Sequence, residues 1–281
     1  MKISLTECPR DAMQGVRQFI PTDLKIKYLN SLLKVGFDTL DFGSFVSPKA
    51  IPQMKDTAEL ISELSLTNTK LLSIIANERG AEDATKFNQV DVVGFPFSVS
   101  EQFQQRNTNS SREQSLERVK NIISISENTH VRVYLSMAFG NPYNEEWSPE
   151  IILRWADALQ NIGITEIVLS DTVGVATPST ITSIYHRLNA EITEMNINCH
   201  FHSTPDTWKE KIEAAQEQGC TGFDSALKGY GGCPMANDEL VGNIATENLI
   251  QHFTTESLPG INEDAFSNSM KIADEIFGNY F

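Results

Sequence analysis

Short apolar runs alternate with longer amphipathic stretches along the whole chain. The short runs begin near residues 3, 39, 70, 90, 131, 166, 197 and 222 and predict strands. The stretches between them carry helix signals. Ser110 with Glu113 predicts a capping box, and Ser148-Pro149 and Thr177-Pro178 each predict a cap followed by proline. The pattern therefore predicts strands and helices in alternation.

Glycine marks the point where several of these helices end and a strand follows. Thr22 is expected to cap a helix that runs to about residue 35 and ends at Gly36, and Gly163 and Gly219 precede the sixth and eighth strands. Eight such units over roughly 250 residues predict an α/β fold, the (β/α)8 TIM barrel. A doubly wound open sheet is the competitor, but no Gly-x-Gly-x-x-Gly follows the first strand.

We predict a single TIM-barrel domain over residues 1–281. The barrel is expected to occupy about residues 1–255, and an extra C-terminal helix about residues 262–278. No linker, low-complexity tract or second domain is evident in the sequence.

The composition excludes several classes of function. The chain has 281 residues and a net charge of −15, so it is a poor nucleic-acid binder and has no attraction for an anionic membrane surface. No apolar run reaches the roughly 20 residues that span a bilayer, and the start of the sequence is expected to be a strand and not a signal or transit peptide. The 4 cysteines are far apart and form no C-x-x-C pair, which indicates a reducing compartment and a cytoplasmic location.

Ionisable side chains gather at the predicted carboxyl ends of the strands, where the active sites of TIM barrels lie. His200 and His202 share one face, because successive side chains of a strand alternate. With Asp11 they make a plausible ligand set for Mg²⁺, Mn²⁺ or Zn²⁺ that leaves positions open for substrate oxygens. Taken alone, a His-x-His pair is more often two ordinary histidines that are satisfied by hydrogen bonds. The other strand-end groups are Arg10, Asp41, Ser44, Ser47, Asp171 and the segment 228–243.

Six short motifs follow one another along the chain. They are PRDAMQ at 9–14, SFVSPK at 44–49, DTVG at 171–174, HFH at 200–202, GGCP at 231–234 and GNIATE at 242–247. In this order they resemble the 3-hydroxy-3-methylglutaryl-CoA lyase family, over residues 6 to about 250. That family belongs to the metal-dependent TIM-barrel lyases and synthases with an R-D-G signature.

The resemblance implies roles for the strand-end residues. Asp11, His200, His202 and Asn243 would hold a divalent metal cation, Mg²⁺ or Mn²⁺ before Zn²⁺. Arg10 would steady an enolate oxygen. Cys233, on a glycine-flanked loop, would close over an acyl-CoA substrate and transfer a proton, with His202 as a second candidate. The residues predicted to bind the substrate are Gln14, Asp41, Ser44, Ser47 and Asp171, and a homo-oligomer, in the first instance a dimer, is expected.

The implied reaction is the retro-Claisen cleavage of 3-hydroxy-3-methylglutaryl-CoA to acetyl-CoA and acetoacetate, a reaction of leucine catabolism. This chain departs from the family pattern at Thr6, Ala12, Asp41 and Ser203, and has one extra residue between Cys233 and Asn243. Because Thr6 replaces a glutamate, Arg10 is expected to lack that carboxylate partner. The departures motivate lysis of another 3-hydroxyacyl-CoA, or a Claisen condensation of acetyl-CoA with a 2-oxo acid, as alternatives. A non-catalytic barrel that binds metal or CoA is a third hypothesis.

Each candidate residue also has an ordinary structural interpretation. Asp11 or Asn243 could cap a helix, and Asp171 could cap the turn after its strand. Cys233 could be a small buried apolar side chain. The metal hypothesis therefore depends on whether Asp11 from the first strand end meets the two histidines of the seventh strand.

Overall fold

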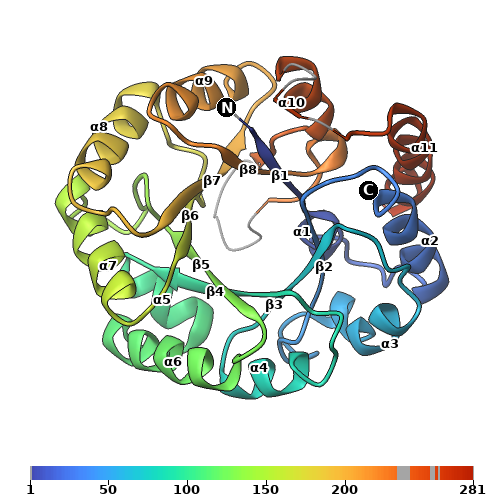
Figure 1. The fold of residues 1–281 in the computed structure, drawn as a ribbon, viewed down its shortest axis with the longest axis horizontal. Coiled ribbons are helices and arrows are strands. Elements are labelled where there is room, and N and C mark those ends of the chain that lie inside the picture. Colours follow the sequence, from blue (N-terminus) through green and yellow to red (C-terminus); the bar gives the residue numbers. More distant parts are fainter. Residues whose placement is uncertain (1, 233–240, 254–256, 259, 281) are drawn as a thin grey trace.

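Eight parallel strands close into a barrel with helices around it (Figure 1). The computed structural model describes residues 2–232, 241–253, 257–258 and 260–280. The strands are β1 (Ser4–Glu7), β2 (Thr39–Ser44), β3 (Lys70–Ile74), β4 (Val92–Ser98), β5 (His130–Ser136), β6 (Glu166–Asp171), β7 (Asn196–Ser203) and β8 (Gly222–Ser225). They pair in the order β6-β5-β4-β3-β2-β1-β8-β7, and β6 also pairs with β7, which closes the ring. The predicted (β/α)8 barrel is confirmed.

Helices alternate with the strands along the chain, and the longer ones form a layer outside the barrel (Figure 1). The helices are α1 (Pro9–Gln14), α2 (Thr22–Leu32), η1 (Pro52–Met54), α3 (Thr57–Ser62), α4 (Glu78–Ala84), α5 (Glu101–Thr108), α6 (Arg112–Ile125), α7 (Pro149–Asn161), α8 (Pro178–Asn189), α9 (Trp208–Glu217), η2 (Leu227–Gly229), α10 (Thr246–His252) and α11 (Glu263–Tyr280). The extra C-terminal helix is thus confirmed as α11, which packs against α2 (Figure 1). Among the described helices, none is both long and apolar enough to cross a membrane.

The predicted capping box ahead of α6 was displaced by one residue. Ser111 is the cap and Gln114 its partner, whereas the prediction used Ser110 and Glu113. Ser111 has the extended backbone of an N-cap, with φ −72° and ψ 168°. The hydroxyl of Ser110 instead shares a hydrogen bond of 2.7 Å with that of Ser115. The sequence could not distinguish the two positions, because Ser110 with Glu113 and Ser111 with Gln114 both have the spacing of a capping box.

The start and end of α2 also differ from the prediction. Thr22 is the first helical residue and not the cap, and its hydroxyl donates to Asp56 at 2.9 Å. The helix ends at Leu32, because the N–H groups of Lys34 and Val35 donate to the carbonyl oxygens three residues earlier, those of Ser31 and Leu32. Gly36 follows with a φ of +94°. The predicted caps Ser148 of α7 and Thr177 of α8 are confirmed, each with proline in the first helical turn.

A ninth strand of two residues, β9 (Gly242–Asn243), pairs antiparallel with the carboxyl end of β7. Asn243 lies opposite His202, and Gly242 lies opposite Ser203. The sequence pattern did not predict this strand. It brings Asn243 from a distant part of the chain to the mouth of the barrel.

The interior of the barrel is polar at its amino-terminal end. Arg132 donates from Nη1 to Oγ1 of Thr6 at 3.1 Å and pairs through Nη2 with Glu166 at 2.9 Å. Glu166 also accepts from Nδ2 of Asn198 at 2.8 Å and lies 2.7 Å from Nε2 of His130. Burial alone would raise the pKa of Glu166, but His130 and Arg132 stabilise its carboxylate and the pKa is lowered.

Replacing Glu166 by alanine is expected to lower the free energy of unfolding by about 3–5 kcal/mol, because it leaves the Arg132 guanidinium buried without its carboxylate. Urea denaturation at neutral pH measures this loss. Since the folded pKa of Glu166 lies below its ordinary value of 4.5, the contribution is present above that pH and is lost as the pH falls through the folded value. The control is Glu191→Ala, which removes an exposed ion pair with Arg187 and should cost less than about 1 kcal/mol. Equal losses in the two variants would contradict the prediction.

Candidate active site

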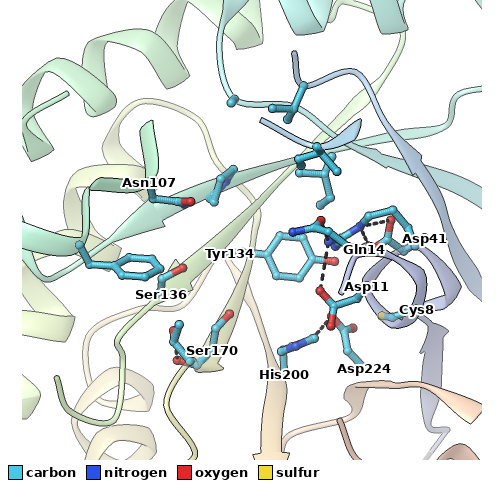
Figure 2. Close-up of a pocket in the computed structure, with 18 of the residues that line it drawn as sticks. Cys8, Asp11, Gln14, Asp41, Asn107, Tyr134, Ser136, Ser170, His200 and Asp224 are labelled. Atoms are coloured by element: carbon cyan, nitrogen blue, oxygen red, sulfur yellow. Dashed lines mark hydrogen bonds and ion pairs between the residues drawn. The ribbon is translucent and has the colours of Figure 1, made fainter. Parts of the chain in front are cut away.

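A cavity of about 410 Å³ opens at the carboxyl end of the barrel strands (Figure 2). One wall is polar and is lined by Arg10, Asp11, Asp41, His200, His202 and Asp224. Another part of the lining is apolar and consists of Val46, Ile51, Ile74, Pro96 and Phe103. Such a cavity suits a ligand with one chelating or charged end and an apolar remainder.

His200 and His202 both line the cavity from β7, as the alternation of strand side chains predicts. Their Nε2 atoms lie 3.3 Å apart. Nδ1 of His200 lies 3.2 Å from Oδ2 of Asp224, and Nδ1 of His202 lies 3.2 Å from the backbone oxygen of Thr172. When both Nδ1 atoms carry and donate the proton, two Nε2 lone pairs face each other, and a cation between them relieves that repulsion.

Asp11 in α1 approaches the two histidines. Its Oδ2 accepts from Nδ2 of Asn243 at 2.7 Å, and its Oδ1 accepts from Nη1 of Arg10 at 3.1 Å. Ligand atoms of Asp11, His200 and His202 all lie within 4.8 Å of one another. Burial would raise the pKa of Asp11, but Arg10 and the two histidines lower it to about 2. The structure thus brings together the acid and the two imidazoles that the sequence singled out.

This group of ligand atoms fits a divalent metal ion. Two imidazoles and a carboxylate suit Mn²⁺, Zn²⁺ and, with further oxygens, Mg²⁺. Two nitrogens bound at about 2.1 Å and at right angles lie about 3 Å apart, close to the 3.3 Å between the Nε2 atoms. Burial and the neighbouring His200 lower the pKa of His202 to about 4, so its ring is neutral at pH 7 and can act as a ligand. Asn243 donates from Nδ2 to Asp11 and to the backbone oxygen of Tyr230, so its Oδ1 is the atom that could reach an ion.

The carboxylate of Asp41 holds Arg10, although the glutamate expected at position 6 is replaced by threonine. Nε and Nη2 of Arg10 both donate to Asp41, the shortest bond being 2.6 Å, and Nη1 donates to Oε1 of Gln14 at 2.9 Å. Thr6 contacts Arg132 instead, so Arg10 has no carboxylate partner at position 6, and Asp41 takes that role. Burial raises the pKa of Asp41 to about 6 against the opposing effect of Arg10. With both oxygens of Asp41 bonded to Arg10, Asp41 fixes the guanidinium at the cavity wall.

Three of the predicted substrate-binding residues do not line this cavity. The Ser44 hydroxyl donates to the backbone oxygen of Ile74 at 3.1 Å, and Ser47 is exposed. Asp171 accepts from Nζ of Lys211 at 2.7 Å, and Lys211 also donates to the backbone oxygen of His202 at 2.8 Å. Asp171 therefore supports the strand that carries His202, and direct substrate contact by these three residues stays a prediction. Gln14 does line the cavity.

Asp224 and Tyr134 belong to the site but were missed from the sequence. Asp224 bonds Nδ1 of His200 and lies in β8, whose four residues were noted only as the strand after a glycine turn. Tyr134 of β5 lines the cavity and meets the His200 ring edge-on, with centroids 6.2 Å apart (Figure 2). An acid at the third position of a buried strand was the signal for Asp224, since inward-facing positions recur every second residue.

The residues before Cys233 pack closely around Asn243. Gly231 has a φ of +97°, and a Cβ on it would lie 2.6 Å from Nδ2 of Asn243 and 3.0 Å from the backbone of Ala12. Glycine is therefore needed here for the Asn243 amide to reach Asp11. Cys233 itself lies outside the described residues, so its place over the cavity stays a prediction.

Replacing Gly231 by alanine is expected to weaken Mn²⁺ binding by about 10–100-fold, because the added methyl displaces Asn243 from Asp11. Isothermal titration with Mn²⁺ measures this change. Gly163→Ala is the matched control, since Gly163 has a similar φ of +100° but no atom within 4 Å of the added Cβ. If both variants bound Mn²⁺ equally well, the contact with Asn243 would not matter for the site.

Comparison with known proteins gives consistent matches along the chain. The model of the HMGL-like family matches residues 2–272. The chain is 32% identical over 253 residues to the hydroxymethylglutaryl-CoA lyase YngG of Bacillus subtilis, covering 89% of this chain and 84% of that protein. It is 34% identical over 253 residues, with the same coverage, to a 3-hydroxy-3-isohexenylglutaryl-CoA/hydroxymethylglutaryl-CoA lyase of Pseudomonas aeruginosa.

A solved structure agrees with these matches. The chain superimposes with a TM-score of 0.90 on an HMG-CoA lyase of Acinetobacter baumannii in complex with coenzyme A and 3-methylmalate. The two are 30% identical, and the match covers 99% of this chain and 92% of that chain.

Proposed function

This chain belongs to the HMGL-like family, whose model matches residues 2–272, and on that premise we propose its reaction. We propose that the enzyme is a metal-dependent carbon–carbon lyase that cleaves 3-hydroxy-3-methylglutaryl-CoA to acetyl-CoA and acetoacetate. The observation that carries the proposal is the convergence of Asp11, His200 and His202 within 4.8 Å of one another at the wall of an open cavity. The relatives in Bacillus subtilis and Pseudomonas aeruginosa bear names of the same activity.

The residues that would hold the cation are Asp11, His200, His202 and Asn243. A bound divalent ion supplies Lewis acidity to a chelated C3 hydroxyl and carboxylate of the substrate. Asp224 and the Thr172 carbonyl fix the ring orientation of His200 and His202, so these two ligands need little rearrangement when a cation binds.

Arg10 would stabilise the enolate oxygen that develops when the C2–C3 bond breaks. Its bonds to Asp41, Asp11 and Gln14 use four of its five N–H groups among the described residues, which leaves one N–H of Nη2 for a substrate oxygen. Because Asp41 holds the guanidinium in place, this donor needs no reorganisation as charge develops. One such donor is worth about 3 kcal/mol in the barrier.

Two proton transfers complete the reaction. A base must take the C3 hydroxyl proton, and an acid must protonate the enolate carbon of acetyl-CoA. We assign the protonation of the enolate carbon to Cys233. The glycines that precede it in the sequence suit a segment that closes over the substrate. His202 is a second candidate, although an imidazole bound to a metal is a poor base.

The test is to incubate the purified protein with Mg²⁺ or Mn²⁺ and 3-hydroxy-3-methylglutaryl-CoA and to measure acetoacetate. Formation of acetoacetate and acetyl-CoA in equal amounts is expected. Metal binding without cleavage of this thioester would remove the substrate assignment while leaving the family assignment in place.

Cleavage of a 3-hydroxyacyl-CoA with a larger C3 substituent is the second candidate. The apolar lining of Val46, Ile51, Ile74 and Phe103 favours it, because an alkyl branch gains free energy when it leaves water for such a wall. The Pseudomonas aeruginosa relative is named for a substrate with an isohexenyl group as well as for the methyl one. The ratio of kcat/KM for the two thioesters discriminates between the candidates.

A further inference from the structure

Cys8 lies in the site, but the proposed reaction does not use it. It precedes α1 at the end of β1, it is 1% exposed, and it lines the cavity. Cys8, Asp224 and His200 form a second group of ligand atoms that lie within 4.8 Å of one another. Figure 2 shows Asp224 below Asp11, between His200 and Cys8.

His200 is shared by the two groups through its two ring nitrogens. Nε2 lies 3.3 Å from Nε2 of His202, and Nδ1 lies 3.2 Å from Oδ2 of Asp224. A neutral imidazole carries one proton and one ring lone pair. With the proton on Nδ1, the lone pair of Nε2 is available to bind a cation together with Asp11 and His202. With the proton on Nε2, that N–H donates to Nε2 of His202, and the lone pair of Nδ1 joins Asp224 and Cys8.

We propose that Cys8, Asp224 and Nδ1 of His200 form a second site for a thiophilic divalent cation such as Zn²⁺, Co²⁺ or Cd²⁺. We further infer that a cation at this site excludes one from Asp11, His200 and His202, because one neutral imidazole completes only one group at a time. On binding, the thiol proton leaves to solvent and a sulfur–metal bond forms. Binding at the second site stands on its own three ligands, whereas the exclusion rests on the proposed function of the first group.

The surroundings of Cys8 favour a cation. Burial, Asp224, Asp41 and Asp11 together raise the pKa of the Cys8 thiol well above its ordinary value. Burial is the largest of these causes, and the carboxylates that add to it also attract a divalent ion, which in turn stabilises the thiolate. Around one tetrahedral ion, ligand atoms lie about 3.3–3.6 Å apart, so the three side chains would close on the ion by roughly 1 Å.

Thiolate softness separates the two sites chemically. Carboxylate and imidazole accept Mg²⁺ and Mn²⁺, whereas a thiolate selects softer ions over Mg²⁺. The first group would therefore hold the hard ion in the absence of thiophilic metals. A thiophilic ion would then inhibit the enzyme by competing with the catalytic cation for His200, and it would not compete with the substrate.

Cobalt binding tests the second site without any need for turnover. Half an equivalent of Co²⁺ added to the metal-free protein is expected to give a thiolate-to-cobalt charge-transfer band. The band should be absent from Cys8→Ser, retained in Cys233→Ser, and shifted to about 10–100-fold higher Co²⁺ concentration in Asp224→Asn. Thermal unfolding of each variant checks that it is folded. A wild-type protein without the band, or the same band in Cys8→Ser, overturns the site.

Magnesium tests the exclusion. A large excess of Mg²⁺, which does not favour sulfur, is expected to weaken the charge-transfer band of the cobalt-loaded wild type, because His200 returns to Asp11 and His202. A rise in the unfolding temperature with Mg²⁺ shows that the ion is bound. A band that does not change when Mg²⁺ is bound overturns the exclusion. These readouts do not depend on which thioester the enzyme cleaves, so they remain informative if the substrate proposal fails.

Discussion

Replacing Asp11 by asparagine is expected to weaken Mn²⁺ binding by more than about 100-fold and to reduce thioester cleavage at least as much. Asp11 supplies the negative charge in a group whose other two members are imidazoles. Its pKa of about 2 shows that it is ionised at any pH where the protein would work. Asparagine keeps the size of the side chain, so the change isolates the charge. Isothermal titration with Mn²⁺ and an acetoacetate assay measure the two effects.

The matched control for Asp11 is Asp23→Asn, which removes an exposed carboxylate in the first turn of α2. It should leave Mn²⁺ affinity and turnover within about twofold of the wild type, since substitutions of exposed residues away from the site have small effects. Retention of Mn²⁺ affinity by Asp11→Asn would show that the cation binds elsewhere, and the proposed function would lose its basis.

Replacing Arg10 by lysine is expected to lower kcat by about 100–1,000-fold with little change in KM. Lysine can keep an ion pair with Asp41, but it cannot present the planar fork that bonds Asp41 through Nε and Nη2 and still leaves one N–H of Nη2 for a substrate oxygen. The lost interaction forms only as charge develops on the enolate oxygen, so it affects the rate more than substrate binding. Steady-state kinetics at saturating Mn²⁺ measures both constants.

Two further measurements make the Arg10 prediction specific. Mn²⁺ affinity should stay within a few-fold of the wild type, which separates this variant from the loss of a metal ligand. Arg79→Lys, at an arginine whose side chain is 88% exposed, controls for the change of cation type. A rise in KM with an unchanged kcat would mean that Arg10 binds the substrate in its ground state, and its assigned role would be wrong.

The fold could be predicted because each strand and helix of the barrel is a separate local signal. Short apolar runs recur eight times, glycine precedes three of them, and proline follows the predicted cap of two helices, which together indicate a repeated strand–helix unit. The strand β9 could not be found this way, because two residues show no periodicity and their pairing with β7 depends on the closed barrel. The cap of α6 was misplaced for a local reason, since Ser110 and Ser111 offer the same spacing and only the backbone decides between them.

The candidate site was predictable where two ligands lie on one strand, as with His200 and His202, or directly follow a strand end, as with Asp11. Contacts between elements were harder to foresee. Asp41 was interpreted as a substrate-binding residue, whereas its two oxygens bond Arg10, 31 positions earlier, because β1 and β2 are neighbours. Asp224 was overlooked because one acid in a short buried strand is a weak signal, and its link to His200 follows only once β8 is known to lie beside β7.

The two-residue strand β9 has a consequence for how the family can vary. Asn243 is placed by its register against His202 and by its contacts with Asp11 and Tyr230, and not by the number of residues that precede it. A change in chain length between Gly232 and Gly242 would therefore leave the amide in place, provided that this pairing and the packing of Gly231 are kept. Proteins that keep this pairing and these contacts could then differ in length before Gly242 and still present the same amide to the carboxylate.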